Sequence, residues 1–473
     1  MFGIQPFSTS SRLRQRLRGE LAVALLRTFL ARGVAALGSL LLGIVLGRLY
    51  GPEGVGIFAL AQSVFLGAGL LARYGMDNTL MRYVGRNAQS VHVLGYLRWA
   101  CTKALWISLT MAGAVFLARH WIALAFDAPH LAPVLVGIAL AIPAFTLAFI
   151  LAGFMKGINR PASACLLENG AISLIAATVI ILCRTLFHLQ GLALAGWGMA
   201  LAAWLVLLSG ALQIRCWQTR QVWSREEARI PKHELNSTSH SFLTIGLAQF
   251  TQQVVGVLIA GVMLSSHDLG LFKSAERLAL LITFILMVIN AVFPPRFAQF
   301  FHQGHHDRLE RLARQGALLG IVMASPLLLV CFLAPGLVLQ VFGAEFKEAA
   351  NLLRVIAVGQ LVNVATGSVG FLLNMTGHEK LMRNIALLCN SVGLLLFLIL
   401  IPLQGSLGAA LALAGVLMLQ NLAALFFVWR TLGIWTLPLP NVLQLCGVRP
   451  RINVAQPSGE KMSENRANKD GRL

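Results

Sequence analysis

The chain has 473 residues, of which 57% are hydrophobic and only 12% charged, and its mean hydropathy is +0.75. Soluble domains carry a charge on about a quarter of their residues, so this composition excludes a soluble globular protein and predicts an integral membrane protein. The formal net charge is +20 at pH 7. Because the basic residues fall on alternate predicted loops, this charge indicates membrane topology, and we expect no nucleic-acid partner.

Twelve apolar stretches follow one another along the chain, each about 17 to 25 residues long, which is enough to cross a hydrocarbon core of about 30 Å as a helix. The predicted spans are 28–49, 57–75, 97–118, 133–155, 164–183, 192–212, 241–264, 273–295, 312–333, 351–373, 385–402 and 407–429. Membrane-spanning strands would show a different, alternating pattern. The predicted fold class is therefore an all-α integral membrane protein with about twelve transmembrane helices.

The positions of the basic residues predict the orientation. With both termini in the cytoplasm, 29 of the 38 Lys and Arg residues lie on cytoplasmic segments and five lie on outer ones. Cytoplasmic loops of membrane proteins carry such an excess, and the basic segments would also attract anionic membrane lipids. The N-terminus resembles a signal peptide in charge, but Arg27 and Arg32 interrupt its apolar region. We expect no cleavage.

Short matches recur between the two halves of the chain. Gly56, Phe58 and Ala61 of the first half match Gly270, Phe272 and Ala275, and "LQG" occurs at Leu189 and again at Leu403. Each match is weak alone, but all fall between equivalent pairs of predicted spans. Six spans per half is an even number, so both halves enter the membrane from the same side, and the sequence predicts two six-helix bundles related by a parallel internal repeat.

The expected domain organisation follows from the spans and the polar segments around them. It comprises a basic cytoplasmic or interfacial segment 1–27, a first bundle 28–212, a cytoplasmic linker 213–240, a second bundle 241–429 and a polar tail 430–473. Leucines repeat every four residues among the arginines of the N-terminal segment, which predicts a short helix lying in the membrane interface. The tail is polar enough to be disordered.

Sequence motifs of enzymes are absent. The chain contains no nucleotide-binding glycine loop, no zinc-protease motif and no nucleophile elbow. Its seven cysteines lack a CxxC pair, so we interpret them as small buried hydrophobic residues. The cluster His302, His305, His306 and Asp307 lies in a predicted cytoplasmic loop without a fixed partner. We therefore expect no catalytic residues, no metal and no cofactor.

Polar residues inside the predicted spans are the candidate functional residues, because a charge at mid-bilayer normally faces a cavity or a partner. The candidates for substrate binding are Arg32 and Ser39 on the first span, Gln249, Gln252 and Gln253 on the seventh, Lys273, Glu276, Arg277 and Asn290 on the eighth, and Asn363 on the tenth. Glu168 and Glu276 are candidate coupling carboxylates. Two alternatives stay open: amide and small residues serve ordinary helix packing in membranes, and arginines near span ends can reach the interface.

Three stretches carry a resemblance to a known family. They are "GRLYGPEGVGIFALAQSVFLGAGLLARYGMDNTLMRYVG" after the first span, "GFMKGINRP" after the fourth and "AVFPPRFAQF" after the eighth. With the span count and the repeat, residues 25–429 resemble the polysaccharide biosynthesis, or O-antigen-type oligosaccharide flippase, family of the multidrug/oligosaccharidyl-lipid/polysaccharide exporter superfamily. The resemblance implies a cleft between the two halves, walled by the first, second, seventh and eighth spans.

The resemblance also implies a function. A family member would move an undecaprenyl-diphosphate-linked glycan from the inner to the outer leaflet of a bacterial inner membrane, and it could associate with other glycan-assembly membrane proteins. An intramembrane arginine suits this cargo because its planar guanidinium matches phosphate oxygens, and Glu276 would pair with Lys273 or Arg277 in the empty site. The rival functions are a small-molecule or drug exporter of the same superfamily and a membrane-embedded enzyme or scaffold of glycan assembly.

Overall fold

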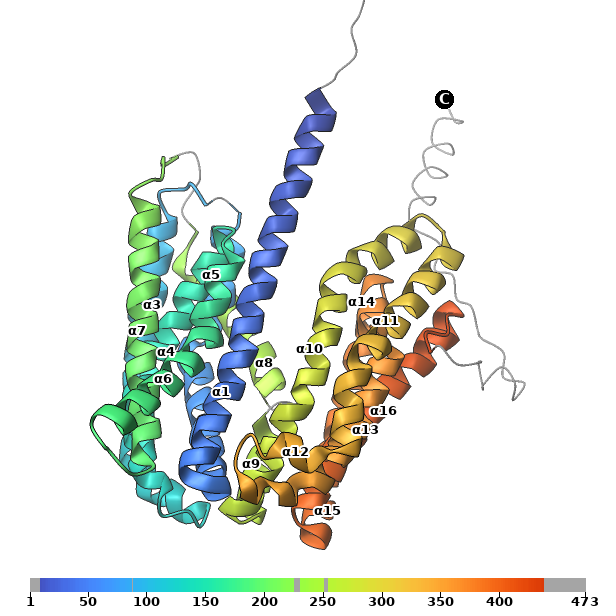
Figure 1. The fold of residues 1–473 in the computed structure, drawn as a ribbon. Helices are drawn as coiled ribbons and strands as arrows, with labels where there is room; N and C mark the ends of the chain where they lie inside the picture. Colours follow the sequence, from blue (N-terminus) through green and yellow to red (C-terminus); the bar gives the residue numbers. More distant parts are fainter. Residues whose placement is uncertain (1–8, 87, 225–229, 251–253, 438–473) are drawn as a thin grey trace, which may run out of the picture. The chain divides into compact units, whose positions relative to one another are not determined.

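The computed structural model describes residues 9–437 except 87, 225–229 and 251–253, and helices make up almost all of them (Figure 1). In chain order the helices are α1 (Thr9–Arg73), α2 (Met76–Val84), α3 (Val93–Ala125), α4 (Leu131–Gly157), α5 (Pro161–Cys165), α6 (Ala171–Leu186), α7 (Ala193–Gln218), α8 (Lys232–Phe250), α9 (Gly256–Met263), α10 (Ser266–His302), α11 (His306–Leu333), α12 (Pro335–Leu339), α13 (Ala350–Thr366), α14 (Val369–Met375), α15 (Glu379–Gln404) and α16 (Ser406–Leu432). A π-helical turn covers Leu166–Gly170 and a 3-10 helix covers Ala344–Ala349. No strand forms within the described residues, so the predicted helical fold class is confirmed.

The helices match the predicted membrane spans in length and composition. Eight helices in the described part of the chain are long and apolar enough to cross a membrane, or nine if α5 and α6, bent by 46°, form one span. The first two predicted spans lie on α1, which kinks at Gly51 (φ +66°) before Pro52. Glycine adopts this backbone conformation without steric strain. The eighth predicted span lies within the unbroken α10, whereas the seventh includes 251–253, which lie outside the described residues. This pattern is consistent with twelve spans in two repeats.

The structure differs from the sequence-based expectation at the N-terminus and in the tenth span. The expected short interfacial helix is not separate: α1 begins at Thr9 and continues into the first span, because no proline interrupts it before Pro52. The tenth span is not one helix, because Gly367 adopts φ +69° between α13 and α14. The Thr436 hydroxyl donates a hydrogen bond to the Thr366 carbonyl oxygen at 2.8 Å, which satisfies an acceptor at this break.

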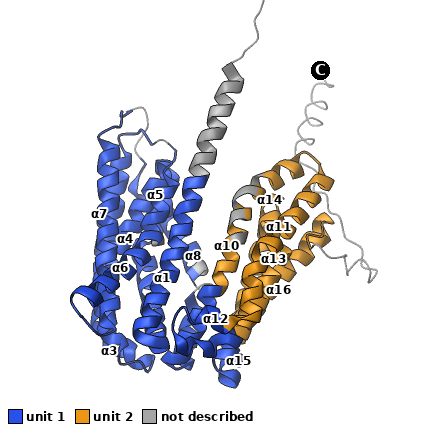
Figure 2. Ribbon diagram, viewed as in Figure 1, with its two compact units in different colours: residues 1–278, 336–352, 397–409 blue, residues 279–335, 353–396, 410–473 orange. Residues whose placement is uncertain are grey.

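The described chain forms two compact units (Figure 2). Unit 1 comprises 1–278, 336–352 and 397–409, and unit 2 comprises 279–335, 353–396 and 410–473. These units follow packing between helices, and the boundaries expected from the sequence at 212 and 241 remain a proposal about the domains.

Helix α4 is the centre of unit 1 and packs against α1, α2, α3 and α7. It is buried along nearly its whole length, as expected for a helix that is apolar on all sides. The rings of Phe65 on α1 and Phe145 on α4 lie 4.2 Å apart. Gly137 and Gly196 let the backbones of α4 and α7 approach closely, since a Cβ atom at either position would collide with the other helix.

Unit 2 has its own hydrophobic core, formed mainly by residues of α10, α11 and α14 to α16. Its fully buried members include Phe297, Leu309, Leu373, Val428 and Trp429. Large side chains that are almost completely removed from solvent dominate the stability of such a core.

Within unit 1 the start of α10 packs tightly against the kink of α1. A Cβ atom at Gly56 would collide with the Ser266 carbonyl oxygen, and one at Gly270 would collide with the Pro52 carbonyl oxygen. Gly56 and Gly270 are equivalent positions of the predicted repeat. In a two-fold repeat, equivalent residues of the two copies contact each other near the symmetry axis. The reciprocal contact of Gly56 and Gly270 has this form. This contact brings the charged start of α10 to α1.

Candidate functional site

The first turns of α10 hold the charges that stand out in the sequence. The helix begins after Ser265, whose Oγ accepts a hydrogen bond from the Asp268 backbone N–H at 3.1 Å and donates one to Asp268 Oδ2 at 2.9 Å. The first of these bonds satisfies one of the helix N–H groups that have no partner within the helix. The capped start and the glycine contact with α1 together position Lys273, Glu276 and Arg277 beside α1.

Lys273 and Glu276 form an ion pair with each other. They are three residues apart on α10, and their side chains are only 16% and 18% exposed. Residues at this spacing lie on the same face of a helix, whereas consecutive residues do not. The helix geometry therefore pairs Glu276 with Lys273, and Arg277 points to another side of α10.

Arg277 lies between α10 and α1, and one of its two terminal nitrogens has no hydrogen-bond partner among the described residues. Its Nη2 donates to Gln62 Oε1 at 3.2 Å. Its Nη1 is buried and has no hydrogen-bond partner among the described residues. The Nη1 atom lies where a side chain of residue 43 would begin, and Arg277 Cδ lies 3.2 Å from that same point. Gly43 therefore makes room for the guanidinium.

A buried donor without an acceptor is unfavourable, because the group has lost its water without replacing it. For a charged group the loss is larger, about 1.5 to 3 kcal/mol per missing hydrogen bond. The guanidinium binds carboxylate and phosphate oxygens through paired N–H groups. An anionic oxygen at Nη1 would therefore supply the missing acceptor.

The segment between α12 and the 3-10 helix Ala344–Ala349 packs against the same part of α1. Arg48 Nε donates a hydrogen bond to the Val341 carbonyl oxygen at 2.8 Å, which ties this segment to the helix. The buried Phe342 ring lies 3.1 Å from the Cβ position of Gly43, and its neighbour Phe346 packs over Gly47. The surroundings of Arg277 on this side are therefore apolar, and an anion beside it would be shielded from water.

Two further candidates, Arg32 and Ser39, lie on α1 before Gly43. Arg32 is exposed and interacts with the Cys165 thiol, on α5. Ser39 is half-buried. Arg32 precedes Gly43 by 11 residues in the same helix, which corresponds to a rise of about 16 Å.

Glu168 pairs with Lys156 in a separate polar cluster of unit 1. The side chains of the pair are 23% and 33% exposed, respectively. Glu168 belongs to the π-helical turn Leu166–Gly170, a distortion that is frequent at functional sites. The pair satisfies the carboxylate, and the coupling role of Glu168 remains a proposal.

The candidates in unit 2, Asn290 and Asn363, belong to hydrogen-bonded groups that join α10 to α13 and to the residue before α14. Asn290 Oδ1 on α10 accepts from the Ser368 hydroxyl at 2.5 Å. Gln360 Oε1 on α13 accepts from Asn363 Nδ2 at 3.1 Å and from the Thr283 hydroxyl at 2.7 Å. Polar side chains hold membrane helices together through hydrogen bonds of this kind.

Three candidates of the seventh span cannot be placed. Gln252 and Gln253 lie outside the described residues, and so does the side chain of Gln249. No group of three or more His, Cys, Asp or Glu residues in the described part of the chain is arranged to hold a metal ion.

The site includes two residues that the sequence did not single out. Gln62 was overlooked because a lone glutamine in an apolar span carries no pattern, although an amide at mid-bilayer is itself a signal. Phe342 was overlooked because an aromatic residue in a loop gives no indication of what it covers.

The comparisons with known proteins agree with this fold. The sequence model of the family described as polysaccharide biosynthesis protein matches residues 24–301, and the model described as MatE matches residues 241–399. The comparison with curated protein sequences gives no match.

Solved structures of transporters share the fold over most of the chain. The lipid II flippase MurJ, in an inward closed conformation, is 13% identical with a TM-score of 0.64, covering 84% of this chain and 86% of that one. The MATE multidrug transporter DinF-BH is 18% identical with a TM-score of 0.58, covering 87% and 95%. A MOP superfamily transporter from Pyrococcus furiosus is 16% identical with a TM-score of 0.55, covering 86% and 94%.

The chain therefore shares the fold of these multi-pass membrane transporters. Within that class, the chain belongs to the polysaccharide biosynthesis protein family, whose model covers more than half of it. The family expected from the sequence is confirmed.

Proposed function

We propose that the protein is a flippase that moves a polyprenyl-diphosphate-linked oligosaccharide from the cytoplasmic to the outer leaflet of the bacterial inner membrane by alternating access. The product would serve the synthesis of a cell-surface polysaccharide such as lipopolysaccharide. Membership of the polysaccharide biosynthesis family supports this function. The observation that supports an anionic cargo is the positively charged guanidinium of Arg277, whose buried Nη1 has no acceptor among the described residues.

The charge balance around Arg277 favours an anion over a cation. Glu276, the nearest acid along the helix, is already paired with Lys273. Gln62, which does contact the guanidinium, is uncharged. A diphosphate that leaves water must recover charged hydrogen bonds, and an arginine with an unused N–H group supplies one.

Deletion of the gene tests the function directly. We expect lipid-linked glycan to accumulate on the cytoplasmic leaflet, where it is protected from a glycosidase added outside spheroplasts, and surface glycan to disappear. A plasmid copy should restore both. Undiminished surface glycan in the deletion strain would rule out the flippase function.

The first rival is an exporter of small molecules or drugs, which the MatE match over 241–399 favours. Exporting cationic drugs would call for unpaired acids within the membrane spans. The two acids that lie within the predicted spans, Glu168 and Glu276, both form ion pairs in the described structure. Increased sensitivity of the deletion strain to cationic dyes, with normal surface glycan, would support this rival.

The second rival is that this protein is itself an enzyme or scaffold of glycan assembly. As a flippase, it could instead associate with other membrane proteins of glycan assembly. The predicted outer loops 119–132 and 334–350 are short for holding a reaction. The related solved structures are transporters. An enzyme would leave lipid-linked glycan exposed on the outer leaflet after deletion, whereas loss of a flippase would not.

The proposed orientation has both termini in the cytoplasm, and it makes a prediction for reporter fusions. Enzymatic reporters fused after Pro231 and after Arg430 should both be active in the cytoplasm, because 29 basic residues lie on the segments assigned to that side. A fusion after Asp127, in an outer loop, serves as the opposite control. A periplasmic signal from either of the first two fusions would refute the topology.

The glycine that accommodates the guanidinium makes a second prediction. In Gly43→Ala, the new methyl group would displace Arg277 Nη1, which is the far end of a flexible side chain. We expect surface glycan to fall about tenfold, corresponding to one misplaced charged hydrogen bond, while the melting temperature changes little. The matched control is Gly113→Ala on α3, where a Cβ atom meets nothing within 4 Å. Normal glycan in Gly43→Ala would show that the guanidinium position is not required.

A further inference from the structure

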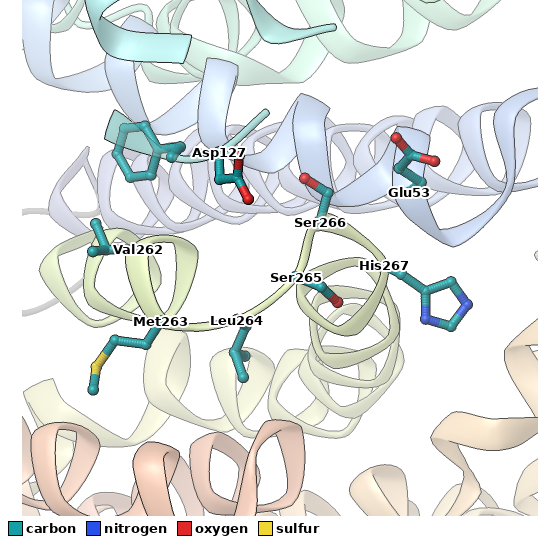
Figure 3. Close-up of a pocket in the computed structure, with 9 residues that line it drawn as sticks. Glu53, Asp127, Val262, Met263, Leu264, Ser265, Ser266 and His267 are labelled. Carbon is teal, nitrogen blue, oxygen red and sulfur yellow. The ribbon is translucent and has the colours of Figure 1, made fainter. Parts of the chain in front are cut away.

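A pocket lies beside the kink of α1 at the same end of unit 1 as the start of α10. Its volume is about 480 Å³, within the range of small-molecule sites. Three segments line it: Glu53 from the kink, Phe126 and Asp127 from the turn between α3 and α4, and 262–267 from the end of α9 to the start of α10 (Figure 3). In the proposed topology all three segments are at the outer ends of their helices.

The lining combines hydrogen-bond acceptors with apolar surface. Glu53 and Asp127 contribute carboxylates, Ser265 and Ser266 contribute hydroxyls, and His267 contributes an imidazole. Figure 3 shows Asp127 and Glu53 on one side of the pocket, with Ser266 between them. Phe126, Val262 and Leu264 supply apolar surface. The lining contains neither lysine nor arginine among the described residues, so this pocket and the Arg277 site have opposite charge.

This chemistry disfavours an anion and matches a sugar. Carboxylates accept hydrogen bonds from hydroxyl groups, and such charge-assisted bonds are stronger than neutral ones. The C–H face of a sugar ring is apolar and packs against an aromatic ring such as Phe126. A metal ion is a poorer occupant, because no metal-binding group of three His, Cys, Asp or Glu residues occurs in the part of the chain that the structure describes.

We propose that this pocket binds a sugar ring of the lipid-linked glycan on the outer side of the membrane. The inference rests on the proposed flippase function and adds a second contact to it: Arg277 holds the diphosphate, and the pocket holds part of the glycan. Each part of the cargo then meets a group of matching chemistry: the diphosphate contacts Arg277, and the sugar hydroxyl groups contact Glu53 and Asp127.

The pocket depends on the packing of α10 against α1. Ser266 lines the pocket, and its carbonyl oxygen is the atom that a Cβ at Gly56 would strike. A motion that separates the two helices would therefore move one wall of the pocket away from Glu53. Binding of a sugar would favour the packed arrangement, because a ligand stabilises the state that binds it better.

Sugar binding can be measured on the purified full-length protein in detergent by saturation-transfer NMR. The probes are the methyl pyranosides of glucose, galactose, mannose and N-acetylglucosamine, tested separately. We expect signal from at least one of them, and about tenfold weaker binding in Asp127→Asn and in Glu53→Gln, each of which removes one charged acceptor. Asn tolerates the left-handed backbone of residue 127 (φ +46°), so the first variant preserves the turn.

The matched control is Glu348→Gln, an exposed acid of another outer loop that does not line the pocket. Phe126→Leu should also weaken binding, because it removes the aromatic ring and keeps apolar bulk. No signal from any of the four glycosides would overturn the proposal, and so would unchanged binding in the pocket variants. Tetramethylammonium binding that requires Asp127 and Glu53, without sugar binding, would overturn it in favour of a cation pocket.

Cells carrying the variants separate this proposal from the flippase function. The double variant Glu53→Gln and Asp127→Asn should reduce surface glycan several-fold relative to Glu348→Gln. If deletion of the gene abolishes surface glycan but the double variant makes normal amounts, the pocket proposal fails alone. If deletion leaves surface glycan intact, the proposed function fails, whatever the pocket binds.

Discussion

Replacing Arg277 by alanine is expected to abolish surface glycan while leaving the amount of protein in the membrane unchanged. The Nη1 atom is buried without an acceptor among the described residues, and Nη2 donates to Gln62. If a diphosphate oxygen completes this site, the variant loses charge-assisted hydrogen bonds worth about 1.5 to 3 kcal/mol each, which is tenfold or more in binding. Surface glycan and membrane abundance, measured on the same cells, check this result.

Two other substitutions distinguish charge from geometry. Arg277→Lys should restore activity only in part, because lysine keeps the charge and loses the planar pair of donors. Arg277→Glu should be worse than alanine, because it repels an anionic cargo. The control is Arg119→Ala, since Arg119 donates to the Phe116 carbonyl oxygen of its own helix at 2.6 Å.

A different pattern would remove the diphosphate role. If Arg277 served only to reach the membrane interface, lysine would replace it fully and alanine would have little effect. Normal surface glycan in a stably expressed Arg277→Ala strain would assign the residue to helix packing, the role that Thr283 and Gln360 have between α10 and α13.

Gly270→Ala is expected to produce the largest loss of stability among single methyl additions at the site. The new Cβ would collide with the Pro52 carbonyl oxygen, which is backbone and unable to rotate away. Overpacking of this kind typically destabilises by about 1 to 3 kcal/mol. We expect a lower melting temperature in detergent together with reduced surface glycan.

Two other glycine substitutions provide comparisons for Gly270→Ala. Gly113→Ala should be neutral or stabilising, because its Cβ meets open space and alanine favours helix over glycine by about 1 kcal/mol. Gly56→Ala should resemble Gly270→Ala, and the double variant should lose less than the sum of the two, because both disturb one backbone contact. A melting temperature of Gly270→Ala equal to that of Gly113→Ala would contradict the close approach of α1 and α10.

The pairing of charges on α10 shows how far local rules extend. The sequence left Lys273 and Arg277 as alternative partners of Glu276. The structure contains the pair with Lys273, because residues three apart share a helix face. The same rule places Arg277 on another face but does not say what lies there. Gln62, 215 positions away along the chain, becomes its partner only through packing of α10 against α1.

Breaks within helices are a second feature that the sequence did not predict. Apolar length correctly predicted a span over 351–373, because burial in lipid depends on composition alone. It did not predict the break at Gly367, since glycine is compatible with a helix and also with φ +69°. Tertiary contacts decide between a continuous and a broken helix. One such contact is the hydrogen bond from the Thr436 hydroxyl to the Thr366 carbonyl oxygen beside the break.

The sequence by itself determined that this protein is helical, spans a membrane many times and belongs to the polysaccharide biosynthesis protein family. These properties follow from composition, span length and short local motifs, which need no knowledge of distant contacts. Only the tertiary structure decided that Arg277 keeps an unused donor, that Gly43 makes room for it and that Glu53 shares a pocket with Asp127 and His267. Such features depend on which helix faces meet, because the energy of a buried polar group is set by the atoms that replace its water.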